Sequence, residues 1–153
     1  MRRHDQEITD KETLEAILNQ APVCRIGLSD HDMPYVVPVN FGYKDGCVYI
    51  HSSQQGRKME IVKRNPNVCF EVEVDVETVP GEIPCKWTVK FKSVIGFGKA
   101  SIIEDPDEKR HALNVIMEHY SGIFDNSYNP KSFDLAAIIK IRIESMTGKG
   151  SKK

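Results

Sequence analysis

Residues 68–75 alternate strictly, and this alternation limits the structure that they can form. The even-numbered positions hold Val, Phe, Val and Val, and the odd-numbered positions hold Cys, Glu, Glu and Asp. A strand with one apolar and one acidic face is typical of an antiparallel sheet, because parallel sheets are usually covered on both faces. The segment therefore predicts an antiparallel sheet with one face toward a core and the other toward solvent.

Other segments extend this pattern into a complete fold. Strands are expected at 23–28, 34–43, 47–51, 87–103 and 135–144, and helices at 9–21, 56–65 and 105–122. Their order is α-β-β-β-α-β-β-α-β, with several short, hairpin-like links. This order predicts a mainly β, α+β fold, namely a six-stranded antiparallel barrel with peripheral helices.

Proline and glycine mark irregular places in this barrel. Pro38 lies inside the strand expected at 34–43, which predicts an edge position or a bulge there. Gly96 and Gly98 lie inside the long strand at 87–103 and predict a bend. Together with Phe97 they form a Gly-x-Gly motif. Since this motif lies within a strand, it does not indicate a dinucleotide-binding turn.

Size and composition indicate one ordinary globular domain over residues 1–153, with flexible ends at 1–8 and 146–153. The net charge is −1, which gives no electrostatic drive toward nucleic acid or anionic membranes. No apolar run approaches the roughly 20 residues needed to cross a bilayer. The four cysteines form no C-x-x-C pair, so we expect reduced thiols, no metal site and a cytoplasmic location.

The segment from His51 to Lys58 is the strongest candidate site. It reads His-Ser-Ser-Gln-Gln-Gly-Arg-Lys and lies between an expected strand and an expected helix. Hydroxyl groups from Ser52 and Ser53, close backbone approach at Gly56, and the charges of Arg57 and Lys58 suit a phosphate at a helix N-terminus. The alternative is a polar loop with two solvated cations. We favour a site because cations are unfavourable at the positive end of a helix unless an anion compensates them.

Other polar and aromatic residues have two interpretations each. Asn40 follows Pro38 and either points to solvent or faces a planar heterocycle at a strand edge. His51 is either a structural hydrogen-bonding residue or a proton relay. Trp87 and Phe91 share one face of a strand. Aromatic residues on such a face belong more often to the hydrophobic core than to a binding site. The acidic residues at 71, 73 and 75 are interpreted as a solvated face, and the other four histidines are assigned no role.

Four motifs in this order resemble the pyridoxamine 5′-phosphate oxidase-like family, specifically its nitroimidazole-resistance branch. The resemblance extends from Met1 to Glu144. The motifs are Val37-Pro38-Val39-Asn40-Phe41-Gly42-Tyr43, then His51-Ser52-Ser53 with Gly56-Arg57-Lys58, then Asn65-Pro66-Asn67-Val68-Cys69-Phe70-Glu71-Val72, then Lys90-Phe91-Lys92-Ser93-Val94-Ile95-Gly96-Phe97-Gly98-Lys99-Ala100.

The resemblance implies a split β-barrel that binds FMN at the interface of a homodimer. It assigns the FMN phosphate to Arg57 and Lys58 with Ser52 and Ser53, and the isoalloxazine ring to Val39, Asn40 and Phe41. It places His51 near the flavin, Lys92 and Ser93 against the cofactor, and Trp87 over the site from the partner subunit. Relatives commonly have Tyr-Arg where this chain has Phe91-Lys92; lysine keeps the charge but loses the bidentate fork.

The leading hypothesis is therefore a dimeric FMN-dependent oxidoreductase that reduces a small planar substrate such as a nitroaromatic, with His51 as the proton donor. The alternative is a non-catalytic module that holds a flavin or haem for storage or sensing, since no nicotinamide-binding motif is visible. Pyridoxamine 5′-phosphate oxidase activity is not favoured, because the chain is short and no second phosphate site can be identified.

Overall fold

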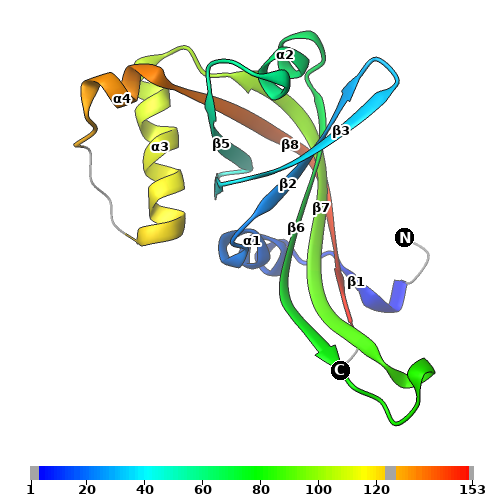
Figure 1. Ribbon diagram of the computed structural model, residues 1–153. Helices are drawn as coiled ribbons and strands as arrows, with labels where there is room; N and C mark the ends of the chain where they lie inside the picture. The colour runs from blue at the N-terminus through cyan, green and yellow to red at the C-terminus, as the bar shows by residue number, and fades with distance from the viewer. Residues whose placement is uncertain (1–3, 123–126, 152–153) are drawn as a thin grey trace.

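The chain folds around one antiparallel β-sheet that curls on itself, with helices at its ends and on one side (Figure 1). This computed structural model describes residues 4–122 and 127–151. The elements in chain order are η1 (His4–Gln6), β1 (Glu7–Ile8), α1 (Lys11–Gln20), β2 (Cys24–Asp30), β3 (Met33–Val39), β4 (Phe41–Lys44), β5 (Cys47–Ser53), α2 (Arg57–Arg64), β6 (Asn67–Val79), η2 (Pro84–Lys86), β7 (Thr88–Ile102), α3 (Pro106–Ser121), α4 (Pro130–Leu135) and β8 (Ala136–Gly150).

The two edge strands of the main sheet path are neighbours in the sequence. The strand order is β3-β2-β6-β7-β8-β5-β4, and every pairing is antiparallel. The chain leaves β3 at Val39 and enters β4 at Phe41, so only Asn40 separates the two edges. A sheet whose opposite edges are joined by one residue has to curl, and this produces the split barrel.

The mainly β, α+β barrel predicted from the sequence is confirmed, and Pro38 lies in an edge strand as expected. The structure describes eight strands where six were expected. One of the additional strands arises because the expected strand at 34–43 is divided at Asn40. The other is the two-residue β1, which pairs with Lys149 and Gly148 of β8.

Regular structure extends into both of the expected flexible ends, with η1 and β1 within residues 4–8 and β8 reaching Gly150. The prediction of a flexible end from residue 146 is wrong for residues 146–150, because β8 continues to Gly150 with β7 on one side and β1 on the other. A Cβ added to Gly148 would lie 2.6 Å from Leu14 of α1, which shows how closely this end packs. Residues 1–3 and 152–153 lie outside the described residues.

The first part of the expected loop at 76–86 is a continuation of β6, which ends at Val79, and the short helix η2 follows at Pro84–Lys86. After an irregularity between Val74 and Glu77, β6 pairs with β7 again as far as Val79 and Thr88. Together they form a hairpin arm, residues 75–92, that projects beyond the rest of the molecule (Figure 1). An ion pair between Asp75 and Lys92, 2.8 Å long, joins the two strands where the arm begins.

The interior of the barrel holds the main core. Helix α1 closes one end of it with Leu14, Ile17 and Leu18, all of which are buried. Helix α3 packs on the outer face of β4 and β5, where a second apolar cluster includes Tyr49 and Val115. Among the described residues, no helix is long and apolar enough to cross a membrane.

Two glycines allow β7 to bend, as the sequence indicated. The β7–β8 register shifts between Phe97 and Gly98. The Phe70 ring of β6 lies directly over Gly96, where an added Cβ would come within 2.2 Å of it. Because Phe70 is fully buried, its ring has little room to move away. Gly96 therefore provides the space that the largest aromatic ring in this part of the core needs.

We predict that Gly96→Ala lowers the free energy of unfolding by about 1–3 kcal/mol, the usual cost of adding a methyl group to a well-packed core. Guanidinium unfolding measures the change. Gly27→Ala is the matched control, because its Cβ would have no neighbour closer than 3.6 Å. Equal effects of the two substitutions would contradict the packing role of Gly96.

Candidate functional site

Strand β5 ends at Ser53, and α2 begins at Arg57 after a short loop. Gly56, the residue before the helix, has φ = 118°, a conformation that L side chains rarely adopt. It has no side chain that could accept hydrogen bonds from the first turn of α2, and open space surrounds it. The first N–H groups of α2 therefore remain accessible to an anion. The sequence predicts a phosphate-binding site at this place, and we refer to Gly56, Arg57 and Lys58 as the cradle.

The two cations of the cradle have different environments. The Arg57 guanidinium lies over the Tyr35 ring of β3, 4.9 Å from its centroid. Lys58 is half-buried, and burial lowers the pKa of its ammonium group. A lowered lysine pKa means that the charge has lost solvation, and an anion close to it would restore stabilisation. Both side chains therefore suit a phosphate.

A cavity of about 410 Å³ opens beside Lys58. It lies where the two sheet edges approach each other, and its lining residues are Val23, Pro38, Val39, Asn40, His51 and Lys58. Four of the residues predicted for the site, Val39, Asn40, His51 and Lys58, therefore lie around one space. Val23 and Pro38 complete it with apolar surface, a contribution that sequence reasoning missed.

His51 faces the cavity from the outer side of β5. Although the residue is exposed, shielding by surrounding atoms and the charges of Lys58 and Lys109 hold the pKa of its imidazole below the usual value. The ring is consequently neutral near pH 7. A neutral imidazole can donate one hydrogen bond and accept another, or take up a proton.

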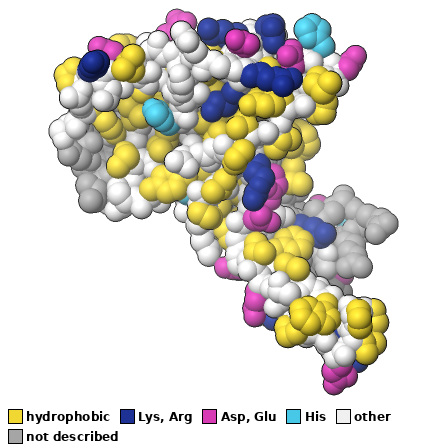
Figure 2. Space-filling model, viewed as in Figure 1, with side chains coloured by type: hydrophobic (Ala, Val, Ile, Leu, Met, Phe, Trp, Pro, Cys, Tyr) yellow, Lys and Arg dark blue, Asp and Glu magenta, His cyan; other side chains and the backbone are white. Residues whose placement is uncertain are grey.

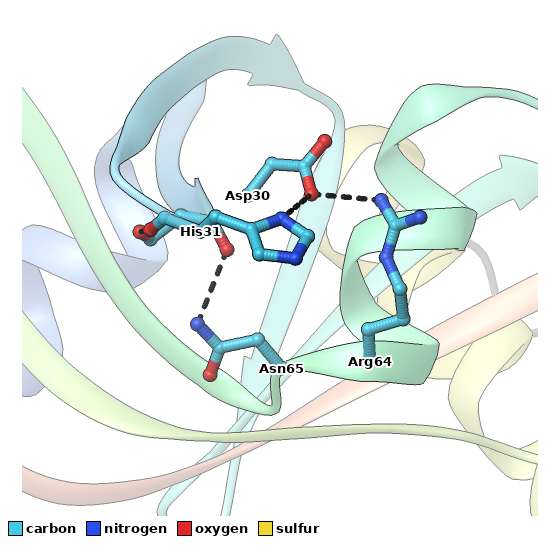
Figure 3. A network of polar contacts seen from close by, with 5 residues as sticks. Asp30, His31, Arg64 and Asn65 are labelled. Atoms are coloured by element: carbon cyan, nitrogen blue, oxygen red, sulfur yellow. Dashed lines mark hydrogen bonds and ion pairs between the residues drawn. The ribbon is translucent and has the colours of Figure 1, made fainter.

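Both ends of α2 are fastened to the β2–β3 hairpin. At the C-terminal end, Arg64 Nη2 donates to Asp30 Oδ1 over 2.9 Å, and Asn65 Nδ2 donates to the Ser29 carbonyl over 3.1 Å. His31 Nδ1 lies 3.2 Å from the same Asp30 oxygen (Figure 3). At the N-terminal end, Arg57 stacks on Tyr35. The hairpin therefore determines where the cradle lies relative to the cavity.

A second contact network lies behind Asn40 and was not expected. The Tyr120 hydroxyl of α3 donates to the Pro22 carbonyl over 3.0 Å and accepts from the Phe41 backbone N–H over 3.1 Å. The neighbouring His119 stacks on the Phe41 ring at 4.6 Å, and its Nε2 lies 2.8 Å from the Ala21 carbonyl oxygen. His119, which was assigned no functional role from the sequence, therefore has a structural one next to the cavity. These contacts fix the backbone next to Asn40.

Some predicted site residues lie elsewhere. The Ser52 side chain is buried on the face of β5 opposite His51 and Ser53, because side chains alternate along a strand. The Phe41 ring is fully buried in the core, so only its backbone lies near the cavity. The strand period could have separated Ser52 from Ser53 in the sequence.

Trp87, Lys92 and Ser93 do not reach this cavity within one chain. Ile102 of β7 and His51 of β5 pair with neighbouring residues of β8, Ile139 and Ile138. Lys92 lies ten residues from Ile102 along β7, about 33 Å at 3.3 Å per residue, and Trp87 is further away still. Trp87 and Lys92 belong to the arm, and Ser93 follows the arm in β7.

The described residues contain no cluster of three or more His, Cys, Asp and Glu side chains that could hold a metal ion. The acidic face of β6 instead forms ion pairs, with Arg25 lying 3.2 Å from both Glu71 and Glu73.

We predict that Tyr120→Phe lowers the free energy of unfolding by about 1–3 kcal/mol, because it leaves the buried Phe41 N–H without a partner. Tyr35→Phe is the control, since its hydroxyl has no hydrogen-bond partner among the residues that the structure describes. Urea unfolding of both variants measures the difference. A Tyr120→Phe variant as stable as the control would remove Tyr120 from this role.

Several solved structures are similar to this chain. A candidate 5-nitroimidazole antibiotic resistance protein from Bacteroides thetaiotaomicron is 38% identical, with a TM-score of 0.83 over 94% of this chain and 86% of that one. The flavocytochrome Anf3 from Azotobacter vinelandii has a TM-score of 0.83 at 23% identity over 100% of this chain and 72% of that one. A FAD- and haem-binding protein from Mycobacterium smegmatis has a TM-score of 0.84 at 17% identity over 97% and 74%.

The last two similarities are too low in sequence identity to show more than the fold. No curated protein sequence matches this chain. The family model described as pyridoxamine 5′-phosphate oxidase matches residues 10–150, which includes the cradle, the cavity and both edge strands. The chain belongs to the pyridoxamine 5′-phosphate oxidase family.

Proposed function

We propose that this protein is an FMN-dependent oxidoreductase that reduces a small, planar, electron-poor substrate such as a nitroaromatic. The observation that carries the proposal is the meeting of Asn40, His51 and Lys58 around one cavity beside the open N-terminus of α2. The cavity is apolar on the side of Val39 and Pro38, and the cradle is cationic. A flavin mononucleotide combines a planar ring system with a phosphate, and therefore matches both parts.

The positions of these residues suit this group. Open space around Gly56 allows a phosphate to approach the first N–H groups of α2. Arg57 would provide a planar fork of donors, and Lys58 would gain a counter-charge that none of the described residues supplies to its half-buried ammonium group. Asn40 lies at the break between β3 and β4, where the backbone and its amide can contact the edge of a ring.

The protein would position the reactants, and the flavin when bound would supply the transfer of electrons between a donor and the substrate. His51 would provide a neutral ring at the cavity rim that hydrogen-bonds the substrate or exchanges a proton with it. Asn40 and the apolar lining would keep the ring oriented and reduce access of water. The similarity to the nitroimidazole-resistance protein from Bacteroides supports a nitroaromatic as substrate class.

We also propose that two copies of the chain form the complete site. An apolar row crosses the outer face of four strands, formed by the paired residues Val36, Gly27, Cys69 and Phe97. Val36 is 65% and Phe97 54% exposed. An apolar row of this kind on the outside of a sheet is typical of a protein interface.

The arm adds to this surface and explains how distant residues could join the site. Its exposed apolar residues are Val76, Ile83, Trp87 and Val89. Figure 2 shows hydrophobic side chains gathered on the projecting end of the molecule. In a dimer, the arm of one copy would bring Trp87, Lys92 and Ser93 to the cavity of the other.

The free thiols of all four cysteines agree with a cytoplasmic location, which we propose as well.

The first test is the visible absorption spectrum of the purified protein and its titration with FMN. We expect a bound flavin, and weaker binding by about 1.5–3 kcal/mol for Arg57→Ala, the value of a hydrogen bond to a charged group. Arg142→Ala, which removes an exposed arginine from β8, is the control. A colourless protein that takes up no FMN would overturn the proposal.

A further measurement distinguishes an enzyme from a storage protein. If the reduced flavoprotein is reoxidised by a nitroaromatic compound, the protein acts as an enzyme; if it is not, a storage role is favoured.

The second test is the mass in solution. We expect sedimentation equilibrium to give about twice the chain mass of 17.4 kDa, and Phe97→Arg to shift the protein toward the monomer because it places a charge in the apolar row. Met33→Lys, which adds a charge at the exposed tip of the β2–β3 hairpin, should remain a dimer. A monomeric wild-type protein that binds FMN would contradict the shared site while leaving the cofactor in place.

A further inference from the structure

A second cavity lies on the other flank of α2. Its volume is about 660 Å³, within the range of small-molecule sites. Buried apolar side chains, Met59, Ile103, Ala136 and Ala137, form its floor. They come from α2, from the residue after β7 and from the start of β8. Local sequence patterns could not indicate this cavity, because it forms only where these three distant segments meet.

The rim of the second cavity has a net positive charge. Lys63 of α2 and Lys109 of α3 lie on it, together with the exposed carboxylate of Glu104. Neither lysine forms an ion pair with any residue that the structure describes. Cations above an apolar floor are complementary to a ligand that combines an anionic group with an apolar body.

Two contacts favour an aromatic body over an aliphatic one. The Met59 side chain belongs to the floor, and a thioether sulfur packs favourably against the edge of an aromatic ring. The Lys109 ammonium group lies over the Phe133 ring of α4, 4.7 Å from its centroid, which holds this lysine at the rim. An ammonium group held in this way is also attracted to the face of a second ring.

The walls of the second cavity are held in place before any ligand binds. Met59 and Lys63 lie one turn apart on the same face of α2. Gln54 lies on the rim, and its Nε2 donates to the Asp134 carbonyl over 2.6 Å, which ties the loop before α2 to α4. A cavity whose walls are already ordered binds a ligand at a smaller cost in entropy.

We propose that the second cavity binds a small aromatic carboxylate, whose ring covers the apolar floor and whose carboxylate pairs with Lys63 and Lys109. This inference goes beyond the proposed function and does not depend on a bound flavin. The first and second cavities have no lining residue in common, and Lys58 lies on a different face of α2 from Met59 and Lys63. The aromatic carboxylate therefore binds whether or not the first cavity is filled.

The ligand also changes the charge that acts on the first cavity. Burial and the charges of Lys58 and Lys109 hold the pKa of the His51 imidazole below its usual value. A carboxylate paired with Lys109 offsets the charge of this lysine, so the pKa of His51 rises when the second cavity is filled. A ligand in one cavity thus alters the protonation of a histidine in the other.

The test uses 2-naphthoate as the probe and NMR of protein labelled with ¹³C at the methionine methyl groups. Met59 lies in the second cavity, whereas Met33 lies at the exposed tip of the β2–β3 hairpin. We expect 2-naphthoate to shift the Met59 signal in a saturable way and to leave the Met33 signal unchanged. The Met59→Leu variant assigns the signal. The titration is made on flavin-free protein and on protein mixed with FMN.

Two analogues and three variants test the chemistry. The neutral 2-naphthamide should bind at least about tenfold more weakly than 2-naphthoate, the scale of one hydrogen bond to a charged group. Decahydronaphthalene-2-carboxylate, which keeps the charge and loses the aromatic ring, should also bind more weakly. Lys63→Gln and Lys109→Gln should each raise the Kd for 2-naphthoate by about tenfold. Lys11→Gln, at an exposed position of α1, should leave it unchanged.

The effect on His51 is measured by NMR titration of the histidine ring protons. We expect saturating 2-naphthoate to raise the pKa of His51 in the wild-type protein. Lys109→Gln should raise this pKa without any ligand, because it removes one of the two positive charges. A His51 pKa that neither the ligand nor Lys109→Gln alters would overturn the link between the cavities.

The remaining outcomes separate this proposal from the proposed function. A Met59 signal that 2-naphthoate does not shift, or equal affinities for 2-naphthoate and 2-naphthamide, would overturn the anion site. Equal affinity for the saturated acid would overturn the aromatic ligand class. Binding that Lys63→Gln and Lys109→Gln leave unchanged would place the carboxylate elsewhere and also overturn the site. Failure to bind FMN would contradict the proposed function and leave the second cavity unaffected.

Discussion

The rest of the structure depends on the covalent connection between the two edges of one sheet. β3 and β4 lie at opposite ends of the strand order, and yet only Asn40 separates them in the chain. This connection forces the sheet to curl into a barrel, and it leaves a gap where the edges meet without pairing. The cavity beside His51 lies at this gap. The candidate site is therefore a consequence of how the barrel closes.

The cradle has a different physical origin. Arg57 and Lys58 lie at the positive end of α2, a position where cations cost stability. The structure compensates part of this cost with the Tyr35 ring and holds the helix at its other end through Arg64 and Asp30. An anion at the open N-terminus would remove the remaining conflict. The β2–β3 hairpin thus keeps in place a charge arrangement that a bound anion would stabilise further.

Local patterns predicted much of this fold, and contacts between distant segments account for most of what they missed. The alternation at 68–75, the edge proline at 38 and the bend near Gly96 depend on neighbouring residues and were predicted correctly. β1 and the ordered end at Gly148 depend on each other, although about 140 residues separate them. The contact of Tyr120 with Phe41 is of the same kind. In the candidate site, the residue types at 51–58 predicted a loop that leads into a helix start. The contribution of Val23 and Pro38 could not be predicted in this way, because it depends on the two sheet edges lying close together.

The arm is explained by an apolar surface that its own chain leaves exposed. Its apolar side chains and the row through Phe97 leave part of the molecule without a cover, and the predicted residues Trp87 and Lys92 are far from the cavity of their own chain. A crystal structure of the protein with FMN would test the proposed binding site most directly. We expect the phosphate at the N-terminus of α2, in contact with Arg57 and Lys58, and the ring beside Asn40 and His51. A phosphate bound elsewhere, or a ring outside the gap between β3 and β4, would contradict it.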